Sequence, residues 1–442
     1  MTPARRGRGL SRRHFALALP SALLASGCAA PHRGTGRPGD PIVLTLLTHY
    51  ASGESKAALQ SPVDEWNATH DRVKVRTTAV EYTDLLTTFM VRQAAGRGAD
   101  IIHPYCLWNG QLVRAGVLRP APPEHAEEIT RGYSAAAVRG ASVGGRVYGY
   151  PTEAQTYALY YNKRLLREAG LDGPPQTWRE LEEAARRTAR RDRYGNTLVQ
   201  GFGLSTYDDS TTVGQTLALL NAAGGSFVSA DGRSTSIDSV AGRAVFELEH
   251  RLVTAGLSSP GVNVYKAFPS GQVAMVVGAG WWTGSLKPLM RSGYRDVGVA
   301  PVPVPEAGDV RATLSTGFMM GVNTASRYPR EAWEFLRWLN ADKVRGRGAT
   351  ATRMSSLQVS AGSLTGRADD MRALLGGGGD PNLRPFLDAL AYAVPEPNVP
   401  GAQQAKSLLR KNIEALWTGQ QSVEQALRTT RRQVDQEVSR SW

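Results

Sequence analysis

Apolar and polar positions follow two alternating periods along most of the chain. Residues 42–50 (IVLTLLTHY) form an apolar run of strand length that ends in polar and aromatic groups, and residues 72–80 (RVKVRTTAV) alternate with the period of a strand. Between them, residues 55–70 carry apolar side chains at helical spacing. Strands separated by helices predict βαβ units and a largely parallel sheet, so we expect an α/β fold.

The same alternation continues to about residue 340. It predicts further helices over 81–98, 162–171, 174–192, 211–225, 240–257 and 328–340, strands over 99–105, 155–162, 273–278 and 316–323, and an extended stretch over 297–305. Thr177 with Glu180 and Ser422 with Gln425 have the spacing of capping boxes. Residues 344–382 are Gly-rich and weakly periodic, and three amphipathic helices are predicted after them.

The alternation is interrupted at GGRVYGYP, residues 144–151, where glycines, tyrosines and a proline lie together. The chain of 442 residues is long enough for two or three domains or lobes. Two α/β regions therefore meet near residue 150, which is the predicted crossing between lobes.

The first residues have the pattern of an export signal. SRRHFALALPSALLASGC has basic residues, then an apolar run, then small residues before Cys28. Its S-R-R-x-F core resembles a twin-arginine signal, and Ala25–Cys28 resembles a lipobox. We expect a twin-arginine lipoprotein signal peptide over 1–27, a lipid on Cys28 and a flexible tether over 28–41. The alternative is an ordinary signal peptide cut after an A-x-A-like site.

The formal net charge of +13 invites comparison with nucleic-acid-binding proteins. Five of these charges lie in the segment expected to be removed, which leaves +8, and the remaining cations are scattered among glutamates on helix faces. Because steering of nucleic acid needs a field of one sign, we expect no nucleic-acid partner. Cys106 has no second cysteine beyond Cys28, so we expect a buried residue without a disulfide.

The motifs of several enzyme classes are absent from the sequence. It has no H-E-x-x-H, no C-x-x-C and no Gly-Lys pair of a phosphate-binding loop. The six histidines after Cys28 are widely spaced, so we expect no metal site, no cofactor and no catalytic residues. His49 and His103 follow predicted strands, where a binding role and a plain structural role both stay open. A glycosidase pair of carboxylates also stays open, since its geometry is not sequential.

Several stretches resemble one known family. Residues 64–102, residues 144–185 with their G-x-x-Y-G-x-P, Y-Y-N-K, A-G-L and T-W-x-E-L elements, and SGQVAMVVGAGWW at 270–282 are similar to the extracellular solute-binding proteins of ABC importers. The likeness is to the sugar-binding family that includes maltose-binding protein, and it runs with gaps from about residue 42 to 438. His49 and Tyr50 stand where members of that family frequently carry Trp or other aromatics.

The resemblance implies a two-lobed α/β fold of the periplasmic-binding-protein type (type II), with a hinge between the lobes that lets them close on a ligand. We expect residues 42–150 in lobe 1, residues 151–310 in lobe 2 and residues 311–360 back in lobe 1. The C-terminal helices of 361–442 are expected mainly on lobe 2 and the hinge.

A pyranose has an apolar face and a polar rim, so its site needs flat aromatic rings beside groups that hydrogen-bond hydroxyls. Trp281 and Trp282 follow a predicted strand among glycines, and we expect one to stack on the ligand and the other to pack. The other predicted ligand-binding residues are Tyr50, Trp108, Glu153, Tyr157, Asp208, Thr316, Gly317 and Arg353.

Structural alternatives stay open for several of these residues. Trp108 and Tyr157 could be core residues, and Glu153 could form a salt bridge at the hinge. Asp208 could cap the following helix, and Gly317 could only permit tight packing of strands.

The resemblance implies a monomeric, exported, lipid-anchored receptor on the outer face of the cell membrane. It would capture a sugar or oligosaccharide and deliver it to an ABC permease that works with a separate ATPase. Two alternatives stay open. One is the same scaffold holding a glycerophosphodiester or peptide, and the other is an exported carbohydrate-active enzyme.

Overall fold

The computed structural model describes residues 39–51, 53–204, 206, 209–346, 349–376 and 379–441. The predicted signal peptide, Cys28 and most of the predicted tether lie outside these ranges. Residues 41–442 form one compact unit, which contains the two sheets described below. Over the described ranges, no helix combines the length and the apolar character needed to cross a membrane.

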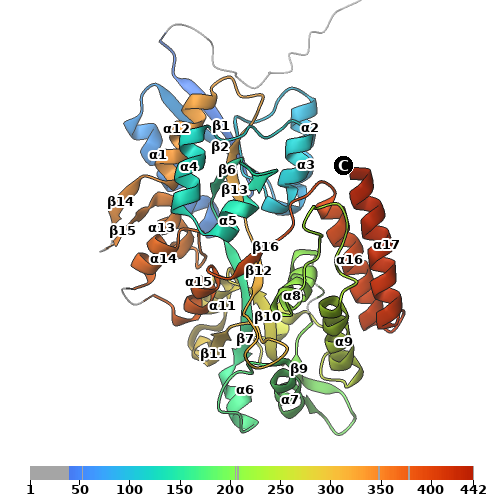
Figure 1. Ribbon diagram of the computed structural model, residues 1–442. Helices are drawn as coiled ribbons and strands as arrows, with labels where there is room; N and C mark the ends of the chain where they lie inside the picture. The colour runs from blue at the N-terminus through green and yellow to red at the C-terminus, as the bar shows by residue number, and fades with distance from the viewer. Residues whose placement is uncertain are drawn as a thin grey trace, which may run out of the picture. The chain divides into compact units, whose positions relative to one another are not determined.

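The first sheet has five strands in the order β2-β1-β3-β13-β6 (Figure 1). They are β1 (Ile42–Thr48), β2 (Val73–Ala79), β3 (Ile101–Ile102), β6 (Gly149–Pro151) and β13 (Met319–Val322). β1 is parallel to β2 and β3, whereas β13 is antiparallel to both β3 and β6. The carboxyl ends of β1, β3 and β6 and the amino end of β13 therefore share one edge of the sheet.

Helices cover both faces of this sheet because neighbouring strand residues point to opposite sides. Leu46 joins the core cluster that contains α1 and α12, and Leu47 joins the cluster that contains α2 and α3. The helices of this part are α1 (Gly53–Thr69), α2 (Tyr82–Ala94), α3 (Asn109–Arg114), α4 (Pro123–Gly132), α5 (Ala135–Gly140), α12 (Pro329–Asn340), α13 (Arg353–Ser360) and α14 (Ala368–Leu375).

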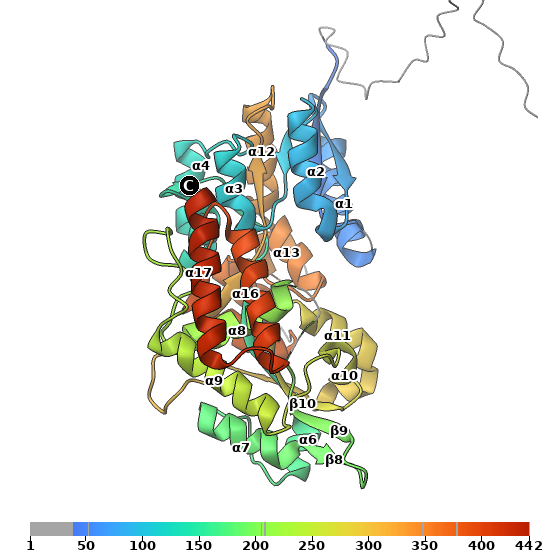
Figure 2. The ribbon, with the colours of Figure 1, turned by 90° about the vertical axis from the view of Figure 1, so that its right-hand side faces the viewer.

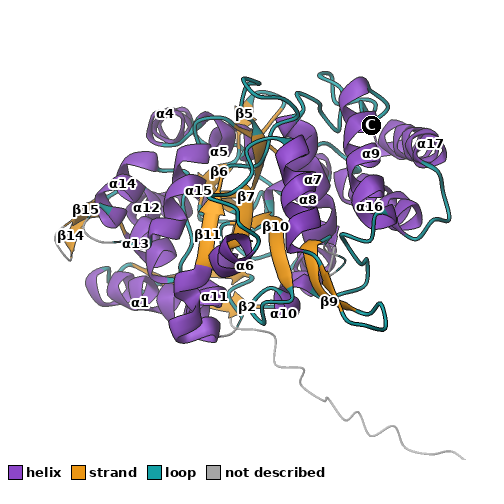
Figure 3. Cartoon of the chain, turned by 90° about the horizontal axis from the view of Figure 1, so that it is seen from below, coloured by secondary structure: helices purple, strands orange, loops and turns teal. Residues whose placement is uncertain are grey.

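The second sheet is built around β7, which is antiparallel to its neighbours β10, β11 and β12. Its strands are β7 (Gln155–Asn162), β8 (Arg190–Arg191), β9 (Thr197–Phe202), β10 (Val273–Ala279), β11 (Val297–Ala300), β12 (Thr313–Thr316) and β16 (Ala393–Pro395). Two separate hairpins pair β4 (Ser142–Val143) with β5 (Arg146–Val147) and β14 (Lys343–Gly346) with β15 (Ala349–Thr352). Figure 3 shows helices on both sides of the strands.

The remaining helices surround the second sheet. They are α6 (Lys163–Glu168), α7 (Trp178–Thr188), α8 (Asp209–Ala222), α9 (Val240–Thr254), α10 (Val264–Ala267), α11 (Trp282–Met290), α15 (Arg384–Ala389), α16 (Ala402–Trp417) and α17 (Val423–Ser441). Short 3₁₀ helices span Cys106–Trp108, Arg291–Asp296 and Pro381–Leu383. α16 and α17 lie side by side and pack against α8 and α9 (Figure 2).

The chain passes between the two sheets three times, and the last passage lies between β13 and β16. It leaves β6 for β7 through Thr152–Ala154, close to the crossing that the sequence predicts near residue 150. It returns from β12 to β13 through Gly317 and Phe318. β12 therefore still belongs to the second sheet, although the sequence grouped residue 311 onward with the returning segment.

Most of the elements predicted from hydrophobic spacing are confirmed, and β7 spans the predicted residues Gln155–Asn162. The single strand predicted over 316–323 is wrong, because the chain crosses between the sheets after β12 and only Met319–Val322 form β13. The prediction of a largely parallel sheet is also wrong, since β7 and β13 are antiparallel to all of their neighbours. Both capping boxes form, one between Thr177 and Glu180 and the other between Ser422 and Gln425. Cys106 forms no disulfide in the described structure and is partly rather than fully buried. Burial raises the pKa of its thiol.

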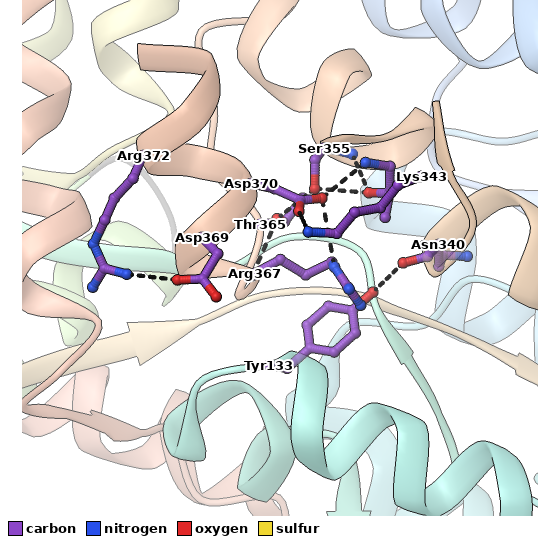
Figure 4. Close-up of polar contacts among 10 residues, drawn as sticks. Tyr133, Asn340, Lys343, Ser355, Thr365, Arg367, Asp369, Asp370 and Arg372 are labelled. Carbon is purple, nitrogen blue, oxygen red and sulfur yellow. Dashed lines mark hydrogen bonds and ion pairs between the residues drawn. The ribbon is translucent and has the colours of Figure 1, made fainter. Parts of the chain in front are cut away.

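Part of the weakly periodic region 344–382 is regular, because it holds β14, β15, α13 and α14. The Asp370 carboxylate is only 1% exposed and contacts Lys343 Nζ at 3.1 Å and Arg367 Nε at 3.5 Å (Figure 4). It also accepts a 2.8 Å hydrogen bond from the backbone N–H of Thr352. Buried ionic contacts thus tie α14 to the hairpin, and a search for apolar periods does not detect them.

A second buried carboxylate predicts a pH-dependent stability. Glu249 of α9 is fully buried and accepts hydrogen bonds from Thr216 Oγ1 at 2.8 Å and from Trp417 Nε1 at 3.0 Å. Burial raises the pKa of Glu249 to about 7, and the two hydrogen bonds offset only part of this effect. The folded state therefore keeps a proton that the unfolded chain releases above about pH 4.5, so stability falls as the pH rises from about 4.5 to 7, by about 3 kcal/mol in total.

Glu249→Gln is expected to remove this pH dependence, because the amide stays neutral and Thr216 can accept from it. At pH 8 the variant should be more stable than the parent by about 2 kcal/mol, and at pH 5 the two should be similar. Urea unfolding at both pH values measures the difference. Glu247→Gln on the same helix is the control and should change neither value by more than about 0.5 kcal/mol. Equal effects of the two substitutions would contradict the assignment to Glu249.

Candidate functional site

The candidate site lies at the shared edge of the first sheet. His49 follows β1, His103 follows β3, Glu153 follows β6, and Phe318 precedes β13. The strand order brings these residues together although they are far apart in the sequence. Ligands of open α/β sheets commonly bind beyond the carboxyl ends of the strands, which is where this edge lies.

Glu153 is the centre of a hydrogen-bonded group. Its Oε1 accepts a 2.6 Å hydrogen bond from Tyr50 Oη and lies 3.2 Å from His49 Nε2. Gln358 Nε2 of α13 donates to Tyr50 Oη at 2.5 Å. Burial alone would raise the pKa of Glu153, but the contacts with His49, Tyr50 and Gln155 outweigh it and the pKa is lowered. The group therefore holds a carboxylate that is 11% exposed and ionised at neutral pH.

His103 is a neighbour of His49 and Glu153 and is fully buried. Its Nδ1 lies 2.9 Å from Thr48 Oγ1, and its Nε2 lies 2.7 Å from Thr152 Oγ1. Burial, with a smaller contribution from His49, lowers the pKa of His103 well below its usual value. The ring is therefore neutral at pH 7, with one nitrogen donating and the other accepting.

Aromatic rings line the same edge. The ring of His49 stacks on Phe318 with centroids 3.8 Å apart, and Tyr82 stacks on Trp108 with centroids 5.5 Å apart. Phe318 and Tyr82 are partly exposed, whereas Trp108 is buried and donates from Nε1 to Gln403 Oε1 at 2.8 Å. Of these rings, Tyr82 and Phe318 can offer a face to a solute.

The two adjacent tryptophans take different environments. Trp282 is 3% exposed and packs among Tyr160, Tyr265 and Phe268. Trp281 is 39% exposed, and its ring stacks on Tyr265 with centroids 5.6 Å apart. The structure therefore places Trp282 in the core and leaves only Trp281 with an open face.

The pairing of β10 with β7 places the backbone that precedes Trp281 beside the amino end of β7. The backbone N–H of Gly280 donates to the carbonyl of Thr156 at 3.1 Å, and Ala279 is paired with Tyr157. Glu153 precedes Thr156 by three residues. The amino end of β7 thus lies between the carboxylate group on the first sheet and the exposed tryptophan beside the second.

Three of the predicted ligand-binding residues lie near this crossing and contact neighbouring parts of the protein. A Cβ added to Gly317 would lie 2.1 Å from the carbonyl oxygen of Glu153, so the glycine permits close backbone packing. Thr316 ends β12, and its Oγ1 lies 3.5 Å from the carbonyl oxygen of Gln155. Tyr157 is buried in the core of the second sheet, with its hydroxyl against Gly214. Gly317 and Tyr157 therefore take the structural roles that the sequence had left open.

Arg353 and Asp208 are not part of the group. Arg353 lies at the start of α13, where Nη2 contacts Glu65 Oε1 at 2.7 Å and the guanidinium lies 3.8 Å from the ring centroid of Trp338. Asp208 lies outside the described residues. Its neighbour Asp209 accepts a 2.5 Å hydrogen bond from Ser407 Oγ and pairs with Arg410 at 2.9 Å.

Two hollows in the surface help to delimit the site. A cavity of about 20 Å³ behind Glu153 and Gly317 has room for about one water molecule. A hollow of about 830 Å³ lies between α7 and α9, beside the second sheet. Arg251 and Glu182, which line it, form an ion pair at 2.7 Å. No predicted ligand-binding residue lines the larger hollow.

Sequence reasoning placed Tyr50 and Glu153 in the site and left His49 and His103 open, but it missed Tyr82, Phe318 and Gln358. Phe318 lies inside the strand predicted over 316–323, so the rule for the carboxyl ends of strands does not select it. Gln358 lies in the weakly periodic region and has no local sequence signal.

The chain is similar to known solute-binding proteins. The model of the family described as bacterial extracellular solute-binding protein matches residues 50–345. A binding protein of Brucella abortus (strain 2308) is 26% identical over 266 residues, which are 59% of this chain and 62% of that protein. The chain thus spans less than two thirds of the length of this relative. The galactooligosaccharide-binding protein of Bacillus subtilis (strain 168) is 22% identical over 403 residues, 88% of this chain and 89% of that protein.

A solved structure shows the same fold. The cyclic alpha-maltosyl-1,6-maltose binding protein from Arthrobacter globiformis has a TM-score of 0.76 and 22% identity, and the match covers 90% of this chain and 100% of that one. The predicted two-lobed α/β fold is confirmed by this likeness.

Proposed function

Since the chain belongs to the family of bacterial extracellular solute-binding proteins, we propose that it is the solute-capturing component of an ABC importer for a sugar or oligosaccharide. Two of the similar proteins are named for sugars, galactooligosaccharide and cyclic alpha-maltosyl-1,6-maltose. An extracellular family implies an exported protein. In this proposal the solute leaves the protein unchanged, and the chain catalyses no reaction.

One observation supports a sugar above other solutes, and it is the pairing of an ionised carboxylate with partly exposed rings. Glu153 offers charge-assisted acceptors for hydroxyl groups, while Phe318 and Tyr82 offer flat apolar faces. Trp281 adds a third ring at the other side of the crossing. A pyranose ring presents both chemistries at once, an apolar face and a rim of hydroxyls.

The two sheets supply the parts for capture by closure. We assign the strands of the first sheet and the helices on it to one lobe. The strands of the second sheet, β16 included, form the other lobe together with α16 and α17, and the hinge includes Thr152–Ala154 and Gly317–Phe318. A solute that binds best when the lobes are closed shifts the population toward that form, which the permease then recognises. A lipid on Cys28 would hold the monomeric receptor at the outer face of the membrane, and a separate ATPase would supply the energy.

A glycan panel tests the proposal. Purified protein is heated with each mono- and oligosaccharide, and the ligand is then examined by mass spectrometry. We expect saturable stabilisation by at least one saccharide, following RT ln(1 + [L]/Kd), with the saccharide recovered intact. Cleavage of a glycosidic bond would favour a carbohydrate-active enzyme. Stabilisation only by glycerophosphodiesters or peptides would show that the scaffold holds a different solute.

Glu153→Gln is expected to weaken binding of that saccharide at least tenfold, or about 1.4 kcal/mol, because the amide loses the charge and half of the acceptor capacity. Calorimetric titration measures the change. Glu128→Gln is a matched control, since Glu128 also accepts from a tyrosine hydroxyl, that of Tyr150 at 2.8 Å, but lies on α4. A loss of affinity in both variants, or in neither, would remove Glu153 from the proposed site.

A further inference from the structure

We propose that His49, His103 and Glu153 form a binding site for one divalent cation of the zinc class. One candidate ligand atom from each residue lies within 4.8 Å of the other two. His49 and His103 directly follow strands of the first sheet and Glu153 lies two residues after β6, so the rigid sheet holds the three donors in place. The site goes beyond capture of a neutral sugar, which needs no metal.

The separations are close to those of a tetrahedral zinc site. Zinc bonds of about 2.0–2.1 Å place neighbouring tetrahedral ligands about 3.3 Å apart. His49 Nε2 and Glu153 Oε1 are already 3.2 Å apart. The candidate ligand atoms of the three residues lie within 4.8 Å of one another, so His103 needs to approach by at most about 1.5 Å, which is within reach of a side-chain rotation.

The surroundings provide the second layer of contacts that metal-binding histidines require. Whichever nitrogen of His103 turns toward the cation, the other keeps a threonine hydroxyl, Thr48 on one side or Thr152 on the other. Phe318 holds the ring of His49 by stacking. Tyr50 orients Glu153 through its 2.6 Å hydrogen bond to Oε1.

His49 carries a sign that its present contacts are incomplete. Its Nδ1 is buried, and no group in the described part of the chain forms a hydrogen bond with it. A buried imidazole nitrogen without a partner loses its hydrogen bond to water without replacement, which is costly. Coordination of a cation through Nδ1, after a rotation of the ring, would satisfy this atom, whereas coordination through Nε2 would leave it unmet.

The donor set selects the class of cation. Two imidazoles and one carboxylate suit zinc and similar transition metals, whereas calcium and magnesium prefer a shell of oxygen atoms. Three protein ligands leave one tetrahedral position for a water molecule or for an oxygen atom of a solute. Glu153 and His49 are partly exposed, so this position faces the side from which a solute would approach.

The test uses tag-free, full-length protein freed of metal by dialysis against a chelator. Zn²⁺ is titrated by calorimetry without any sugar, and Co²⁺ is followed through the visible absorption of a tetrahedral complex. We expect one Zn²⁺ per chain. His49→Gln and Glu153→Gln should each weaken binding at least tenfold and abolish the tetrahedral Co²⁺ spectrum, with folding checked by circular dichroism.

His250→Gln is the matched control, because Nδ1 of His250 on α9 is also buried without a hydrogen bond but has no second histidine beside it. It should leave Zn²⁺ affinity unchanged. X-ray absorption of the zinc-loaded parent should show nitrogen and oxygen ligands with the signature of two imidazoles, which tests the site even if a variant fails to fold.

Absence of stoichiometric binding, or Zn²⁺ binding that both substitutions leave intact, would mean an adventitious ion only and would overturn the proposal. A sulfur ligand in the absorption spectrum, which only a cysteine or methionine could supply, would overturn it as well. Because these measurements contain no saccharide, they fail or succeed independently of the sugar-binding function proposed above.

Discussion

Trp282→Ala is expected to lower the free energy of unfolding by about 3–5 kcal/mol, whereas Trp281→Ala is expected to leave the fold intact. Trp282 fills a cavity bounded by Tyr160, Tyr265 and Phe268, with ring centroids 5.0, 4.8 and 5.3 Å away. Removal of this ring loses its buried apolar surface and leaves a void that the neighbouring rings cannot fill. Trp281 keeps one face on Tyr265 and exposes the other, so its removal costs about 1 kcal/mol or less.

Ligand affinity should show the opposite order. Under the proposed function, Trp281→Ala removes a stacking surface and weakens saccharide binding about tenfold, or about 1.4 kcal/mol. Urea unfolding gives the first pair of values and calorimetric titration the second. Phe268→Leu is the control, because Phe268 packs against Trp282. It should lower the free energy of unfolding without weakening saccharide binding. Equal stability losses for both tryptophans, or an unchanged affinity in a folded Trp281→Ala variant, would contradict the division of roles.

The predictable part of the fold is the part held by apolar burial. β7 was located to the residue because its eight residues are nearly all buried, and α12 because Ala332, Phe335 and Leu336 form one apolar stripe. The β14–β15 hairpin and the helices α13 and α14 were not predicted, because ionic contacts of Asp370 help to hold them. A carboxylate in a sequence looks the same whether its partners are buried or solvated.

The site was predictable only in outline for a related reason. The rule for α/β sheets points to residues after strands, which selects Tyr50 and Glu153 correctly as neighbours. It does not state that β3, β13 and β6 follow one another in the sheet, and that order is what brings His103 beside Glu153. Arg353 does not lie beside Tyr50 and Glu153, because its guanidinium is held by Glu65 of α1 and by the ring of Trp338.

Lys406→Met is the second substitution for which we expect a large loss, about 3–5 kcal/mol in the free energy of unfolding. Lys406 of α16 and Glu396 after β16 are 2% and 4% exposed, with Nζ 2.5 Å from Oε1. Tyr105, which follows β3, donates from Oη to Oε2 of the same carboxylate at 2.5 Å. Methionine conserves most of the volume, so the loss measures the charge that Glu396 then carries without a cation.

The double variant separates charge from packing. Glu396→Gln combined with Lys406→Met leaves no buried charge, and Gln can still accept from Tyr105, so at least half of the lost stability should return. Arg186→Met is the control, because its ion pair with Glu183 at 3.0 Å is exposed and should contribute less than about 1 kcal/mol. A loss below about 1 kcal/mol for Lys406→Met would mean that solvent reaches Glu396. The contact between β3, β16 and α16 would then be looser than the distances indicate.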